Sequence, residues 1–149
     1  MAKKLNQPIY LITDGSKLRK EGNLLWAIEE AFEGGEGRIG FLQVREQVFG
    51  ENPASDEELI SLIEFLKPLC KKHSVKLILN SRADLVEEYQ LDGVHLGERS
   101  ISIEAARKAL GQDYIIGYSA HSEEEVIHLN ADYFFLSPVF KPISKNTTR

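Results

Sequence analysis

Six short apolar runs, separated by segments of helical periodicity, constrain the fold of this 149-residue chain more than any other feature. The runs lie at residues 9–13, 39–44, 76–80, 93–96, 114–119 and 133–137. Continuous apolar runs are typical of parallel strands that are covered on both faces. Strands alternating with helices predict a parallel sheet with the helices packed outside it. Two α/β architectures fit this pattern: an open doubly wound sheet, or part of a (β/α)8 barrel.

The helical segments carry their own boundary signals. Apolar residues recur at helical spacing through residues 24–32, and we assign Trp26 in this segment to packing. Ser55 and Glu58 form a capping box that begins a long second helix. Pro68 falls inside the apolar pattern of that helix and predicts a kink or an early stop.

Composition predicts a single globular domain over residues 1–149. A net charge of −5 gives no general attraction to nucleic acid, and no apolar run reaches the length of a membrane span. The single cysteine, Cys70, excludes an internal disulfide and lies at a position expected to be buried. We therefore expect a cytoplasmic protein that binds neither nucleic acid nor membrane.

Polar side chains follow the predicted strands at the points where they end. Arg45 comes directly after one apolar run, Asn80 and Ser81 lie at the end of the next, and Ser119 and His121 follow the fifth. In parallel α/β folds, ligands bind beyond the carboxyl ends of the strands. These residues are therefore candidates for a site. The other three histidines, including one at position 95 inside a predicted strand, are assigned to structural or surface roles. The Cys and His residues show no metal-ligand spacing.

Seven segments in order resemble one known family. They are YLITD, LQVRE, LILNSRADL, LDGVHLGE, IIGYSAHS, ADYFFLSPVF and ISKNTTR, and they span nearly the whole chain. Together they resemble the thiamine phosphate synthase family, including its tautomerase-like TenI branch. The resemblance implies a (β/α)8 TIM-barrel fold, of which this chain supplies the first six β strands.

The resemblance also implies roles for particular residues. The synthase joins a pyrimidine diphosphate to a carboxythiazole phosphate and releases pyrophosphate, with Mg²⁺ on the leaving group. By position, Gln43, Arg45 and Asn80 match residues that contact the pyrimidine diphosphate. Ser119 matches a serine near the reacting groups, and Ser144 with Lys145 matches the end of a T-x-T-K loop.

Several positions depart from the family pattern. The family's metal-binding aspartates fall on Ser81 and Ser100, and Glu98 replaces a glutamine. A family lysine falls on Gln47, and the first threonine of the T-x-T-K loop falls on Pro142. Mg²⁺ prefers anionic oxygen ligands, so these neutral hydroxyls argue against the metal-dependent reaction.

We therefore favour a metal-independent, thiazole tautomerase-like isomerase, which would need a proton carrier such as histidine. His121 and Ser119 are the catalytic candidates, and no cofactor is expected. Two alternatives stay open: thiamine phosphate synthase with Mg²⁺, and a regulatory paralogue that binds a precursor without turning it over. In each case the ligand is a small thiazole phosphate or pyrimidine diphosphate. The oligomeric state is left open, a homo-oligomer included.

Members of the family that this sequence resembles continue well past the segment that matches ISKNTTR. A (β/α)8 barrel has eight strands, and its phosphate site usually lies on the loops after strands seven and eight. We therefore expect the natural gene product to be longer than 149 residues, so that this domain is truncated at its C-terminal end.

Overall fold

The computed structural model describes residues 9–13, 19, 21–46 and 53–140. It contains one six-stranded parallel sheet with strand order β1-β2-β3-β4-β5-β6. The strands are β1 (Ile9–Ile12), β2 (Ile39–Val44), β3 (Lys76–Asn80), β4 (Gly93–Leu96), β5 (Ile115–Ala120) and β6 (Tyr133–Leu136). Each neighbouring pair in the sheet is also consecutive in the chain, so every connection is a β-α-β crossover.

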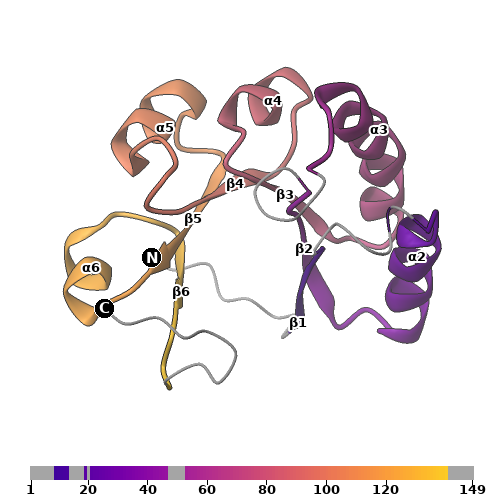
Figure 1. Cartoon of the computed structure of the whole chain (residues 1–149), viewed down its shortest axis with the longest axis horizontal. Helices are drawn as coiled ribbons and strands as arrows, with labels where there is room; N and C mark the ends of the chain where they lie inside the picture. The colour runs from indigo at the N-terminus through magenta and orange to yellow at the C-terminus, as the bar shows by residue number, and fades with distance from the viewer. Residues whose placement is uncertain (1–8, 14–18, 20, 47–52, 141–149) are drawn as a thin grey trace.

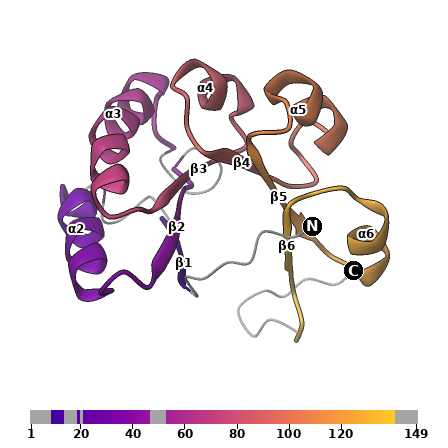
Figure 2. The same ribbon diagram turned by 180° about the vertical axis from the view of Figure 1, so that it is seen from behind.

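The helices all lie on the outer side of a strongly curved sheet (Figure 1). They are α2 (Leu24–Gly34), α3 (Asp56–Lys72), α4 (Ala83–Glu88), α5 (Ile103–Leu110) and α6 (Glu123–His128). Seen from behind, the strands follow an arc whose ends are β1 and β6 (Figure 2). This half-barrel confirms the predicted (β/α)8-type fold with six strands.

The main hydrophobic core fills the space between the sheet and the helices. The central strands β2 and β4 are buried along their whole length, whereas the edge strands β1 and β6 are partly exposed. Cys70 of α3 belongs to this core and is 2% exposed, as predicted. In the described residues, no helix combines the length and apolar character that crossing a bilayer requires.

The helix α3 continues past Pro68 to Lys72, so the early stop that this proline suggested does not occur; Leu66 and Cys70 on either side of it are both buried against the core. The assignment of Trp26 to packing was wrong. Trp26 of α2 is 63% exposed, because it points away from the buried face of that helix. The buried face is formed by Leu24, Ile28 and Phe32.

The concave side of the sheet is lined by aromatic side chains. Tyr10 of β1 stacks on Phe41 of β2, with ring centroids 5.3 Å apart, and meets Phe135 of β6 edge-on at 4.8 Å. The side chains of the first and last strands therefore meet across the interior.

A glycine makes one of these interior contacts possible. The parallel register pairs His95 with Gly117 and Gly117 with Tyr133. A Cβ atom on Gly117 would lie 2.0 Å from the Tyr133 ring. With no side chain on the middle strand, Tyr133 reaches across β5 to His95.

Candidate functional site

Several polar residues of the strands and of the loops that follow them form a hydrogen-bonded network on the concave side of the sheet. Gln43 lies near its centre and is 1% exposed. The Gln43 Nε2 atom donates to the Tyr10 hydroxyl at 3.2 Å, and its Oε1 atom accepts from Asn80 Nδ2 at 2.9 Å. The structure therefore places Gln43 and Asn80 together, with Gln43 as the link between Asn80 and the first strand.

Ser81 and Ser100 join the same network from the loops after β3 and β4. Their Oγ atoms lie 2.8 Å apart, and the backbone N–H of Gly97 donates to Ser100 Oγ at 3.1 Å. Ser81 Oγ also donates to Asn80 Oδ1 at 3.1 Å. The backbone of Ser81 has a φ of 62°, in the left-handed region that Asn and Asp enter more readily than other non-glycine residues.

This pair of serines does not fit the Mg²⁺ site that the family resemblance implies at their positions. Protein-bound Mg²⁺ is held through carboxylate oxygens, whereas Ser81 and Ser100 present neutral hydroxyls bonded to each other. Within the described ranges, no group of three or more His, Cys, Asp or Glu residues could hold a metal ion. The described residues at these positions therefore do not fit a Mg²⁺ ion.

His95 of β4 connects the other side of the network. The imidazole is 3% exposed, with Nε2 2.8 Å from Ser119 Oγ and Nδ1 3.0 Å from the Tyr133 hydroxyl. Burial, together with the smaller effect of the positive charge of Arg45, lowers the pKa of His95 to about 4. His95 is therefore neutral at physiological pH. A histidine inside an apolar strand was a signal for such a role, because buried polar groups need partners.

Tyr10 and Tyr133 complete the network and were not among the predicted site residues. Their hydroxyl groups are hydrogen-bonded to each other across the interior. Burial raises the pKa of both phenols, so both stay protonated at neutral pH. Two-residue strand periodicity could have placed them on the concave side, since Tyr10 alternates with Leu11 of the helix-facing core.

His121 follows β5 and is exposed. Its Nδ1 atom lies 2.7 Å from the backbone oxygen of Ser137, and its backbone N–H donates to Glu125 Oε2 at 2.6 Å. A carbonyl oxygen can only accept, so Nδ1 carries the hydrogen. The other ring nitrogen, Nε2, is then the one able to accept a proton. No hydrogen bond in the described part of the chain joins His121 to the network around His95.

Arg45 lies just beyond β2 and is half-buried. Its backbone N–H donates to Thr13 Oγ1 at 2.9 Å, which ties the ends of β1 and β2 together. The next residue, Glu46, is buried and forms an ion pair with Arg19 at 3.2 Å, while its Oε1 atom has no hydrogen-bond partner among the residues that the structure describes. Arg19 also pairs with Glu58 at the start of α3.

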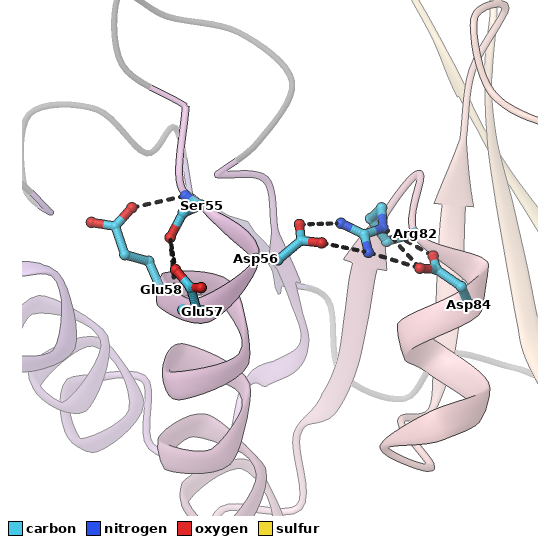
Figure 3. Close-up of polar contacts among 6 residues, drawn as sticks. All are labelled: Ser55, Asp56, Glu57, Glu58, Arg82 and Asp84. Atoms are coloured by element: carbon cyan, nitrogen blue, oxygen red, sulfur yellow. Dashed lines mark hydrogen bonds and ion pairs between the residues drawn. The ribbon is translucent and has the colours of Figure 1, made fainter.

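Ion pairs connect the beginnings of α3 and α4, the two helices that start beside the site. Arg82 forms ion pairs with Asp56 of α3 and Asp84 of α4, each at 2.7 Å (Figure 3). These carboxylates raise the pKa of Arg82 above its ordinary value. At the start of α3, Ser55 and Glu58 form the predicted capping box, which satisfies two helix N–H groups.

Two of the predicted substrate-binding residues, Ser144 and Lys145, lie outside the described residues. So do Gln47 and Pro142, two of the departures from the family pattern. Of the remaining candidates, the structure brings Gln43, Asn80 and Ser119 into one network. It places Arg45 at the carboxyl end of β2 and His121 at that of β5.

Comparison with known proteins identifies consistent relatives. A family model described as thiamine monophosphate synthase matches residues 9–149. The thiamine-phosphate synthase of Bacillus mycoides is 36% identical over 145 residues, covering 95% of this chain and 63% of that protein. The one from Clostridium novyi is 36% identical over 139 residues, covering 91% of this chain and 64% of that protein.

A solved structure supports the same relationship. Thiamine phosphate pyrophosphorylase from Pyrococcus furiosus superposes with a TM-score of 0.74 at 28% sequence identity. The alignment covers 93% of this chain and 64% of the other. The chain therefore spans a little under two thirds of the length of the relatives that it matches.

Proposed function

Because this chain belongs to the thiamine monophosphate synthase family, we propose that it acts in thiamine biosynthesis as a thiamine-phosphate synthase. This reverses the preference for a tautomerase drawn from the sequence. The observation that carries the proposal is the family match over residues 9–149, together with curated relatives that are named for this reaction. The proposed substrates are a pyrimidine diphosphate and a carboxythiazole phosphate.

The strand-end residues have the chemistry that these substrates need. The reaction separates a diphosphate from the pyrimidine, so negative charge develops on the leaving oxygen. The Arg45 guanidinium is always protonated and can donate two parallel hydrogen bonds to phosphate oxygens. Asn80 lies on the neighbouring strand, and its Nδ2 atom has a second hydrogen to offer beyond the one bonded to Gln43. We assign diphosphate binding to Arg45 and Asn80.

The test is formation of thiamine phosphate from the two precursors. Product is expected only when both are present, and Arg45→Ala should lower the rate about 100-fold or more, because a preorganised charge on the leaving group is lost. Arg38→Ala is the matched control. This residue directly precedes β2, at the opposite end of the strand from Arg45, and donates to the backbone oxygen of Gly35. Wild-type protein that is folded but forms no product would overturn the proposal.

Mg²⁺ needs a separate measurement, because the paired hydroxyls of Ser81 and Ser100 supply no carboxylate. Calorimetric titration of the protein with Mg²⁺ alone should give no binding at millimolar concentrations. Stoichiometric binding that is lost in Ser100→Ala would contradict this expectation.

The geometry of His121 favours a second candidate function, the metal-independent thiazole tautomerase. With Nδ1 bonded to the Ser137 carbonyl, the Nε2 atom can act as the base in a proton shift on carboxythiazole phosphate. Such activity should survive a chelator and be lost in His121→Asn. The control, His128→Asn, changes an exposed histidine of α6 and should have no effect. A precursor that raises the melting temperature without either reaction would instead favour a regulatory binding protein.

A further inference from the structure

Eight side chains on the concave side form one continuous hydrogen-bonded chain. In order they are Ser100, Ser81, Asn80, Gln43, Tyr10, Tyr133, His95 and Ser119. They come from all six strands and the loops that follow two of them, and each is bonded to the next. At some of these atoms the group can only donate a hydrogen bond, and at others it can only accept one. These atoms determine which partner donates in every hydrogen bond of the series.

The amide of Gln43 sets the direction at the centre. An amide nitrogen donates and cannot accept, so the Tyr10 oxygen accepts from Gln43 Nε2. The hydrogen of Tyr10 is then directed to its other neighbour, Tyr133. The hydrogen of Tyr133 is in turn directed to Nδ1 of His95.

This direction determines the tautomer of His95. A neutral imidazole carries one hydrogen, and Nδ1 is the acceptor, so the hydrogen lies on Nε2 and is donated to Ser119 Oγ. In the opposite direction, Tyr10 would accept from both neighbours, and its hydrogen would have no acceptor in the described part of the chain. An enclosed donor without a partner is disfavoured by about tenfold or more.

The hydrogen bonds that join Ser100, Ser81 and Asn80 have the same direction. The Asn80 oxygen accepts from Ser81, so the remaining Ser81–Ser100 bond is donated by Ser100. Ser100 in turn accepts from the backbone N–H of Gly97. Every donor in the network therefore points from Ser100 toward Ser119, and among the described residues the hydroxyl hydrogen of Ser119 has no acceptor.

We propose that His95 is a positioning residue, which accepts from Tyr133 and donates to Ser119, and so directs the Ser119 hydrogen toward an anionic oxygen of the bound ligand. The ligand class, a phosphorylated or diphosphorylated precursor, rests on the proposed function. His95 in this state cannot take a proton from Ser119, so Ser119 acts as a hydrogen-bond donor and not as an activated nucleophile. The lowered pKa of His95 agrees with a neutral ring.

The direct test is the tautomer of His95 in the ligand-free protein. Long-range ¹H–¹⁵N NMR spectra of histidine-labelled protein should show the Nε2–H form for His95 between pH 6 and pH 8. The signal is assigned by its loss in His95→Gln. Tyr133→Phe removes the hydrogen donated to Nδ1 and should convert His95 to a mixture of tautomers, whereas His128→Gln should leave the pattern unchanged. An Nδ1–H form of His95 in wild type would overturn the proposal.

A binding cycle tests whether Tyr133 acts through Ser119. Inorganic pyrophosphate is the probe, titrated calorimetrically into wild type, Tyr133→Phe, Ser119→Ala and the double variant, each checked for an unchanged far-ultraviolet spectrum. Ser119→Ala should weaken binding about tenfold or more, because a hydrogen bond to a charged oxygen is lost. As a single change, Tyr133→Phe should weaken pyrophosphate binding severalfold. When it is added to Ser119→Ala, it should weaken binding no further. Additive effects would refute the link.

These outcomes are separate from the proposed reaction. If no thiamine phosphate forms but the His95 tautomer and the pyrophosphate cycle are as expected, the proposed function fails and the positioning role of His95 stands. If thiamine phosphate forms but His95 is the Nδ1–H tautomer, the proposed function stands and the positioning role of His95 fails.

Discussion

Replacing His95 by glutamine should make the protein less sensitive to acid. The folded protein holds the pKa of His95 at about 4, compared with an ordinary value of 6.5 in the unfolded chain. Above pH 6.5 the imidazole is neutral in both states. As the pH falls from 6.5 to 4, the unfolded chain gains a proton that the folded protein does not, so the free energy of unfolding decreases. Below pH 4 both states are protonated and the loss stops.

The magnitude follows from the size of the shift. A difference of about 2.5 pH units, at about 1.4 kcal/mol per unit, gives about 3.5 kcal/mol in full, of which about 3 kcal/mol is lost by pH 4. That is a large share of the 5–15 kcal/mol that typically separates folded from unfolded domains, so the effect is measurable. The groups facing His95 do not titrate in this window. Burial raises the pKa of the neighbouring Tyr133 phenol, so this group stays protonated throughout.

The assay is urea unfolding of wild type and His95→Gln at several pH values from 7.5 to 4. All other titrating groups are common to both proteins and cancel in the comparison. Between pH 7 and pH 4, wild type should lose about 3 kcal/mol more stability than His95→Gln. His128→Gln, at an exposed position on α6, should follow the wild-type curve. Parallel curves for wild type and His95→Gln would refute the conclusion that His95 is neutral because it is buried.

Three further predictions concern packing and capping. Gly117→Ala should cost about 1–3 kcal/mol in urea unfolding, because its Cβ atom would collide with Tyr133; Gly34→Ala, with no atom within 4 Å of its Cβ, should be nearly neutral. Ser55→Ala removes the capping box of α3 and should lower the unfolding free energy by about 1 kcal/mol, and an unchanged midpoint would contradict this. Cys70 is 2% exposed and burial raises its pKa to about 12, so a thiol reagent should label it only in denaturant.

The strands could be predicted closely from the sequence, because each is a buried apolar run between turn residues. The runs at 39–44, 76–80 and 93–96 became β2, β3 and β4 with the same bounds. The fifth run was placed one residue early, since β5 extends to the small residue Ala120 and leaves out Tyr114. Pattern alone did not decide between an open sheet and a barrel. Curvature depends on how the strands twist and pack, which no single run encodes.

The site could be predicted only in part. The sequence proposed Gln43, Asn80 and Ser119 as site residues, and the structure links them in one hydrogen-bonded network: Gln43 bonds Asn80 directly and reaches Ser119 through Tyr10, Tyr133 and His95. The partners of these residues could not be read from the chain, because they depend on the register between strands. His95 and Tyr133 contact each other only because two strands are aligned across Gly117.

The left-handed backbone conformation of Ser81 does not depend on the charge of its side chain. The peptide at this position is held by a 2.9 Å hydrogen bond from its N–H to the backbone oxygen of His95, and this bond does not involve the side chain. A neutral hydroxyl and a carboxylate can therefore be exchanged here without rebuilding the loop, since aspartate adopts this conformation at least as readily as serine. The backbone of this loop therefore does not depend on whether the side chain at position 81 is neutral or anionic, so the local charge can change there while the architecture is retained.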